Sequence, residues 1–205
     1  PPVPARQQGE RPVDQAERAV LVGYEIASGL AGKGYDILAT GEMGIGNTTT
    51  SSAVVSVLLG KEVEEVTGRG AGLSSEGLVR KIHVIRESIR KNRPDRDDVI
   101  DVLAKVGGLD IAGLAGVFLG GAACHIPVVI DGFISSAAAL CAAGLAPASV
   151  DYMMASHRSG EPAGGMVLEA LGHTPFIDCN MTLGEGSGAV AVMPLLDMGR
   201  AVYRD

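Results

Sequence analysis

Hydrophobic and polar positions along the chain fall into blocks whose period changes repeatedly. Apolar residues recur at helical spacing in residues 14–31 and 49–59, and a short apolar run between them, residues 35–40, has the length of a strand. Similar short apolar runs return further along, at residues 127–130, 152–155 and 176–178. This alternation predicts an α/β fold: a Rossmann-like open parallel sheet with helices on both faces, in three layers.

Capping and helix-breaking residues indicate where the other helices lie. A serine at position 74 or 75 opens one helix, and Pro94 opens the next, with Asp97 and Asp98 in its first turns. Residues 63–73 are expected to form a second glycine-rich loop. The predicted helices cover residues 75–90, 94–106, 111–124, 135–143, 161–171 and 189–204.

The composition narrows the classes of function. The chain has 205 residues, of which 46% are hydrophobic, enough for one α/β domain with a core. Only 3% are aromatic and the net charge is −7, which argues against nucleic acid and against anionic membranes as partners. Residues 1–13, rich in proline and polar side chains, are expected to be a flexible arm, and residues 14–205 a single domain.

No cofactor, metal ion or membrane span is expected. The apolar run 111–130 approaches the roughly 20 residues of a span, but Pro127 interrupts it, so we predict a buried helix followed by a strand. Cys124, Cys141 and Cys179 are interpreted as buried free thiols of a cytoplasmic protein. The four histidines show no metal-ligand spacing with these cysteines or with each other.

The stretch GEMGIGNTTTSS at residues 41–52 joins a predicted strand to a predicted helix. Gly44 and Gly46 allow the backbone to approach a ligand closely, and Asn47 and Thr48 add side-chain donors, so this turn can bind an anion. A tight turn without any ligand is the alternative. Glu42 is unusual there, because a carboxylate beside an anion needs a proton donor or a cation.

Polar, glycine-rich loops follow all the predicted strands. In an open parallel sheet, ligands bind outside the carboxyl ends of the strands, so we expect these loops to meet in one site. Asp131 would there bind a ribose hydroxyl or cap its own helix. The four loops are residues 41–50, 131–133, 156–161 and 184–188.

Glu185 lies between two glycines, directly before a predicted helix. In general, a helix N-terminus lowers the pKa of a nearby carboxyl group, whereas an apolar, ligand-filled pocket raises it. A general base needs the second effect to offset the first. A solvated glutamate in a glycine hinge is the alternative, and the residues alone do not separate the two.

Several side chains are candidates for holding a phosphate. Lys81 lies just beyond the glycine loop that carries Arg69, and could point back toward it. Arg158 is a further cation, and Ser159 with Gly160 offers a hydroxyl and an N–H at a predicted helix start. A surface charge is the alternative for Arg69, and a helix cap is the alternative for Ser159.

Five blocks of sequence together resemble one family, the nicotinate-nucleotide:dimethylbenzimidazole phosphoribosyltransferases of cobalamin lower-ligand synthesis. They occur in the family's order and across most of the chain. The blocks are GEMGIGNTT at 41–49, TGRGAGL at 67–73 with Lys81 behind it, DGF at 131–133, SHRSGEPAGG at 156–165 and LGEGSGA at 183–189.

The resemblance implies a cytoplasmic homodimer that acts as a pentosyltransferase. Such an enzyme transfers phosphoribose from nicotinate mononucleotide to 5,6-dimethylbenzimidazole, or a related azole, without a cofactor. It implies that Glu185 is the general base and that Glu42 is a second acid of the site. The implied ribose-phosphate contacts are Gly44, Gly46, Asn47, Lys81, Ser159 and Gly160, and the contacts near the bases are Leu183 and Gly184.

The chain departs from the family pattern in two ways. Family members carry an additional N-terminal region that helps to form the azole pocket, so we expect a complete donor site and an incomplete azole site. A truncated, inactive nucleotide-binding module is therefore the alternative function. In addition, Thr182 stands where the family motif has arginine.

Overall fold

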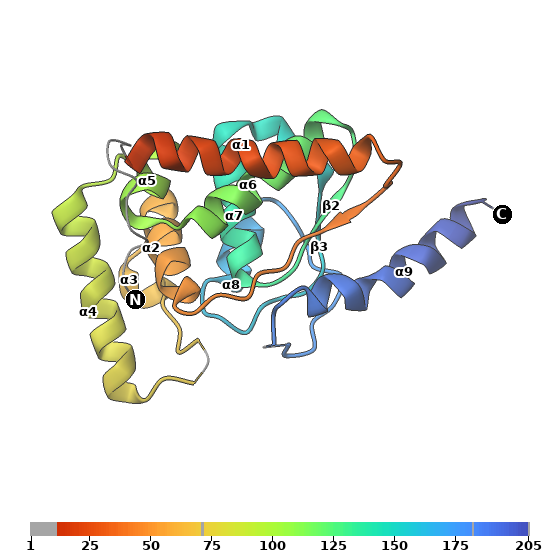
Figure 1. Ribbon diagram of the computed structural model, residues 1–205. Coiled ribbons are helices and arrows are strands. Elements are labelled where there is room, and N and C mark those ends of the chain that lie inside the picture. Colours follow the sequence, from red (N-terminus) through yellow and green to blue (C-terminus); the bar gives the residue numbers. More distant parts are fainter. Residues whose placement is uncertain (1–11, 71, 182, 205) are drawn as a thin grey trace.

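The structure is a computed structural model that describes residues 12–70, 72–181 and 183–204. Within these residues a parallel three-stranded sheet has the order β1 (Leu38–Ala39), β2 (Val128–Ile130), β3 (Met153–Ala155). A parallel bridge between His157 and Ile177 extends the pairing beyond β3. The α/β class with a parallel sheet is thus confirmed (Figure 1).

Helices make up most of the remaining chain. In chain order they are α1 (Pro12–Ala31), α2 (Asn47–Leu59), α3 (Val63–Val66), α4 (Ser75–Asn92), α5 (Val99–Val106), α6 (Leu109–Ala123), α7 (Phe133–Leu145), the 3₁₀ helix η1 (Pro147–Tyr152), α8 (Gly164–Ala170) and α9 (Ser187–Arg204). Figure 1 shows α1 lying across α6, and the second half of α9 extending away from the rest of the chain.

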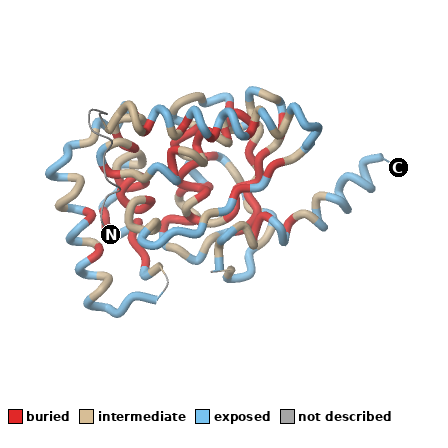
Figure 2. The backbone as a smooth tube through the Cα atoms, in the orientation of Figure 1, coloured by how far each residue is buried: buried red, intermediate tan, exposed pale blue. Residues whose placement is uncertain are grey.

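Alternate side chains of β2 bury themselves on opposite faces of the sheet. Val128 and Ile130 belong to the main core, which contains residues of α2, α5, α6 and α7. Val129 belongs to a smaller cluster with Ala189 and Val192 of α9. Because neighbouring strand residues point to opposite faces, α9 covers one face and the main core the other. Figure 2 shows most of the buried residues in the middle of the fold, between the exposed outer sides of the helices.

Helices α1 and α6 pack backbone against backbone. A Cβ atom at Gly116 of α6 would lie 1.9 Å from the carbonyl oxygen of Val20, and one at Gly23 of α1 would lie 1.8 Å from the carbonyl oxygen of Gly113. No other residue type fits at these two positions. The glycine content of the predicted buried helix therefore serves close helix packing.

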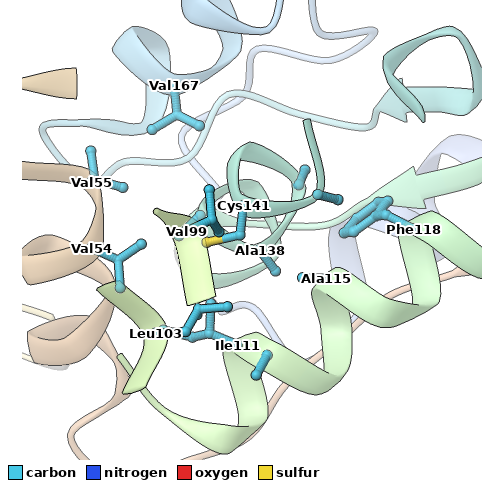
Figure 3. Packing of buried hydrophobic residues seen from close by; sticks show 14 of the residues in the cluster. Val54, Val55, Val99, Leu103, Ile111, Ala115, Phe118, Ala138, Cys141 and Val167 are labelled. Atoms are coloured by element: carbon cyan, nitrogen blue, oxygen red, sulfur yellow. The ribbon is translucent and has the colours of Figure 1, made fainter. Parts of the chain in front are cut away.

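The run 111–130 forms α6 and β2, which confirms a buried helix followed by a strand. Phe118 of α6 and Cys141 of α7 lie fully buried in the main core, where the Cys141 sulfur contacts aliphatic side chains (Figure 3). In the part of the chain that the structure describes, no helix is both long enough and apolar enough to cross a bilayer.

Several predicted boundaries were wrong. The strand predicted at 35–40 is reduced to two residues, and 176–178 forms only the bridge at Ile177. The expected loop 63–73 begins with α3, which carries a capping box between Glu62 and Glu65. The helix predicted from Pro94 begins at Val99, because Asp98 caps it by accepting from the Asp101 N–H.

The expectation of three buried thiols was also wrong. Cys141 is buried, Cys124 is half-buried and Cys179 is exposed. Cys179 lies just beyond the bridge at Ile177, where the chain no longer pairs with the sheet and returns to the surface. Burial raises the pKa of the Cys141 thiol to about 12, so this thiol is inert at neutral pH.

Candidate active site

The loops after β1 and before α9 meet at their glycines. A Cβ atom at Gly41 would lie 2.7 Å from the Gly186 nitrogen, so the two backbones are in direct contact. Gly184, Glu185 and Gly186 all have positive φ, at 76°, 59° and 85°. Glu185 is exposed in this left-handed run, and it is one of few non-glycine residues in the described chain with such a conformation.

Asp131, at the carboxyl end of β2, joins the same loop. Its Oδ2 accepts from the Gly186 N–H at 3.0 Å, and its Oδ1 accepts from the Gly188 and Ala189 N–H groups at 2.8 and 3.1 Å. The side chain is 3% exposed. Asp131 was predicted to bind ribose or to cap its own helix. Its Oδ1 caps α9, whereas α7 has no side-chain cap bond, so the predicted cap on its own helix was wrong.

His157 follows β3 and lies against Asp131 and Gly188. A Cβ atom at Gly188 would lie 2.0 Å from the His157 Nδ1, which shows how closely the imidazole and the start of α9 pack. Ser156 Oγ donates to the Asp131 carbonyl oxygen at 3.2 Å, and we infer that it accepts from His157 Nδ1 at 2.9 Å. Burial lowers the pKa of His157, and the Asp131 charge opposes this only in part.

A second group of contacts surrounds the amine of Lys81. The side chain is only 7% exposed. Its Nζ donates to Thr48 Oγ1 at 2.9 Å and to the Gly68 carbonyl oxygen at 3.0 Å. Burial lowers the pKa of Lys81, and the carboxylate of Glu161 acts in the opposite direction. The structure thus brings together α4, the start of α2 and the loop after α3 around one buried amine. We call this group, formed by Lys81, Thr48 and Gly68, the cradle, because a buried cation beside a helix N-terminus suits an anion.

Glu161 completes this cradle on the side of β3. Its Oε1 accepts from the Gly70 N–H at 3.0 Å, whereas its Oε2 is buried and makes no hydrogen bond within the described residues. The Oγ1 of Thr67, whose side chain is 4% exposed, is also buried and unpartnered there. Native structures pair nearly all such groups, so these two oxygens are available to accept hydrogen bonds from water or from a bound ligand.

Glu42 lies half-buried within its own glycine turn. Its Oε2 accepts from Asn47 Nδ2, and a Cβ atom at Gly44 would lie 2.3 Å from its Oε1. Burial is the main cause that raises the pKa of Glu42, and the charge of Asp110 at the start of α6 acts in the same direction. The amide of Asn47 and the backbone of Gly44 oppose the shift. Sequence reasoning did not include Asp110.

The other predicted site residues lie on the same side of the sheet. Gly46, directly before α2, lies in the left-handed region with φ 88°, and no side chain caps this helix. Ser159 Oγ accepts from the Glu161 N–H at 3.3 Å, and Gly160 beside it is exposed. Leu183 is 74% exposed. Thr182 lies outside the described residues.

Two candidate phosphate ligands are engaged elsewhere. Arg69 donates to the Leu73 carbonyl oxygen at 2.7 Å and to Ser75 Oγ at 3.0 Å, and both contacts are exposed. Arg158 forms an exposed ion pair with Asp178 at 3.0 Å. Lys81 is therefore the cation that the structure places inside the cradle. Glu161 and Thr67 were not predicted as site residues, although they lie within the recognised blocks SHRSGEPAGG at 156–165 and TGRGAGL at 67–73.

A pocket of about 260 Å³ lies at the other end of the sheet. Its lining includes Leu58, Gly144 and Leu171, at the carboxyl ends of α2, α7 and α8, and none of the predicted site residues. The glycine loops lie at the opposite, amino ends of these helices. The chemistry-bearing residues therefore gather away from this pocket.

Known proteins resemble this chain over most of its length. A family model described as phosphoribosyltransferase matches residues 12–205. The chain belongs to this phosphoribosyltransferase family. A protein of Acetivibrio thermocellus named nicotinate-nucleotide-dimethylbenzimidazole phosphoribosyltransferase is 51% identical over 191 residues, covering 93% of this chain and 54% of that protein. A protein of the same name from Desulforudis audaxviator is 54% identical over 191 residues, with the same coverage of 93% and 54%.

A solved structure supports the fold of this chain. The crystal structure of CobT from Thermus thermophilus matches with a TM-score of 0.85 at 43% identity, covering 90% of this chain and 55% of that one. The predicted fold class and family resemblance are confirmed. The chain spans about half the length of the curated relatives that it matches.

Proposed function

We propose that this chain carries the phosphoribosyl-transfer site for nicotinate mononucleotide and 5,6-dimethylbenzimidazole. One observation carries the proposal. The cradle around buried Lys81 and the exposed Glu185 belong to the same edge of the sheet, where the loops at Gly41 and Gly186 contact each other. The family match and the names of the relatives support the same reaction.

The cradle suits the phosphate of the nucleotide donor. Lys81 supplies a positive charge, and the start of α2 supplies backbone N–H groups that no side chain caps. Both favour an anion, and burial strengthens their effect because water screens the charges less. The buried oxygens of Glu161 and Thr67 accept from donor groups, and the sugar hydroxyls are such groups.

The transfer itself needs orientation and one proton acceptor. A ring nitrogen of the azole attacks the anomeric carbon, the bond to the pyridinium nitrogen breaks, and its electron pair neutralises that ring nitrogen as nicotinate departs. The attacking ring loses its N–H proton, for which we propose Glu185 as the general base. Glu42 is the second acid, and its raised pKa fits a carboxyl group that shares or holds a proton.

The test is the release of nicotinate by the purified chain, mixed with nicotinate mononucleotide and a panel of azoles. In Glu185→Gln we expect kcat to fall at least about 100-fold, within the range that positioned proton transfer contributes. Calorimetric binding of nicotinate mononucleotide should stay within about twofold of wild type. Wild-type turnover in this variant would overturn the assignment of the base.

A second candidate is a nucleotide-binding module that does not turn over. Calorimetry separates the two candidates. Binding of nicotinate mononucleotide with no binding of dimethylbenzimidazole favours the module, whereas binding of both and release of nicotinate favour the transferase.

A further inference from the structure

We propose that Asp131 is a positioning residue, whose carboxylate fixes the backbone around Glu185 and thereby sets where the base points. This inference rests on the proposed function, because it concerns how that base is held. Asp131 would exert this role through the backbone amides that its carboxylate binds.

Asp131 binds the Glu185 loop with both of its oxygens. Three N–H groups, those of Gly186, Gly188 and Ala189, point at this one carboxylate from 2.8 to 3.1 Å. A helix cap normally satisfies one or two amides of the first turn with a single oxygen. Here the bond to Gly186 lies before α9 begins, next to Glu185 itself. The carboxylate therefore holds the loop as well as the helix.

The loop needs to be held because its conformation is unfavourable on its own. Glu185 has φ 59°, a region that side chains other than glycine seldom adopt, and glycines in the same region flank it. Residues in such positions persist when surrounding contacts leave no alternative. The Asp131 bonds supply such contacts from β2, fifty-five residues before Gly186.

Two close contacts confine the loop from the other sides. Gly41 meets Gly186 so closely that a Cβ atom would lie 2.7 Å from its nitrogen. His157 packs against Gly188 in the same way, with 2.0 Å between the imidazole and a Cβ built there. The backbone of residues 186–188 is thus contacted by residues that follow β1, β2 and β3. The Glu185 side chain itself is exposed.

The experiment compares Asp131→Asn with Asp98→Asn in the intact chain. Asparagine at position 131 puts an N–H₂ group against at least one of the three N–H groups, so one amide loses its acceptor. Asp98 is a matched control, because it caps α5 through a single oxygen and asparagine caps equally well. The readouts are amide exchange of residues 186, 188 and 189, and the separate kcat and KM for nicotinate mononucleotide.

In Asp131→Asn we expect those amides to exchange at least tenfold faster and kcat to fall at least tenfold, with KM within about twofold. Asp98→Asn should leave all three quantities unchanged. A rise in KM that matches the loss of kcat/KM would overturn the inference and make Asp131 a ligand of the donor. Unchanged exchange at residues 186–189 would also overturn it.

Gly41→Ala keeps the inference testable if Asp131→Asn does not fold. The added methyl group pushes on Gly186 while Asp131 stays intact, so kcat should fall and KM should not. An unaltered kcat in a folded Gly41→Ala chain would count against the claim that the backbone around Glu185 must be fixed for turnover. If the wild-type chain releases no nicotinate, the proposed function falls, but the exchange experiment still decides whether Asp131 fixes the loop.

Discussion

The two halves of the candidate site differ in how their charged side chains are paired. Around Asp131, one carboxylate takes three amides and the imidazole of His157 has a hydroxyl partner, while Ser187 Oγ is buried without a partner among the described residues. Around Lys81, Glu161 Oε2 and Thr67 Oγ1 are buried without partners there. A carboxylate that accepts from three amides fixes the backbone around it, whereas an unpaired charged oxygen lowers its free energy when a ligand supplies the missing bond.

This difference assigns a separate role to each half of the site. The Asp131 half should determine where Glu185 points and should contribute little to affinity. The Lys81 half should determine whether the donor binds at all. Changes in the cradle are therefore expected to move the dissociation constant, and changes around Asp131 are expected to move the rate.

The largest effect on binding is expected from Lys81→Met. Losing a buried, charge-assisted contact to an anion costs about 2 kcal/mol, which corresponds to about a 30-fold weaker affinity for nicotinate mononucleotide. Calorimetry measures this directly. Arg69→Met is the matched control, a cation of the neighbouring loop whose guanidinium bonds Leu73 and Ser75 at the surface. Equal losses in both variants would contradict the assignment of the cradle to Lys81.

A smaller effect is expected from one substitution made at two threonines. Thr67→Val removes a buried hydroxyl that has no partner among the described residues, so the free energy of unfolding of the empty protein should rise by about 1 kcal/mol. Thr40→Val removes a hydroxyl that donates to the Val129 carbonyl oxygen at 2.8 Å, so the free energy of unfolding should fall by about 1 kcal/mol. Denaturant titration measures both.

The Thr67 variant also tests what its hydroxyl is for. If it belongs to the donor cradle, Thr67→Val should bind nicotinate mononucleotide several-fold more weakly although it is the more stable protein. Thr40→Val should bind as tightly as wild type. A stabilised Thr67 variant with unchanged affinity would show that the unpaired hydroxyl belongs to the fold and not to the cradle.

The elements were predictable where the signal is local. Helical periodicity located α1, α4 and α6 to within a few residues, and the rule for parallel strands placed the glycine loops together. The errors in helix boundaries arose where two nearby residues could each begin a helix. Pro94 suits the first turn of a helix, but the Asp98 cap directly before Val99 determined where α5 begins.

The site was less predictable, because its contacts join distant parts of the chain. Asp131 finds its partners 55 to 58 positions later, and no local pattern distinguishes this from a cap on the following helix. Glu161 contacts Gly70 across 91 positions for the same reason. The residue types were evident in the sequence, but the pairing required the fold.

The smallest expected effect concerns the pH dependence of stability in the Asp131 half. Burial lowers the pKa of His157, so the folded state favours the neutral imidazole. The unfolded chain binds a proton near pH 6.5, and the stability that His157 contributes is present above this pH and is lost as the pH falls through the lower pKa of the folded state. In His157→Gln, urea titrations between pH 5 and pH 7 should show a shallower loss of stability than in wild type, by an amount that follows about 1.4 kcal/mol for each unit of pKa difference. The same slope of stability against pH in both proteins would mean that another group causes the difference in proton binding between the folded and unfolded states. The packing of His157 against Asp131 and Gly188 would then not depend on its charge.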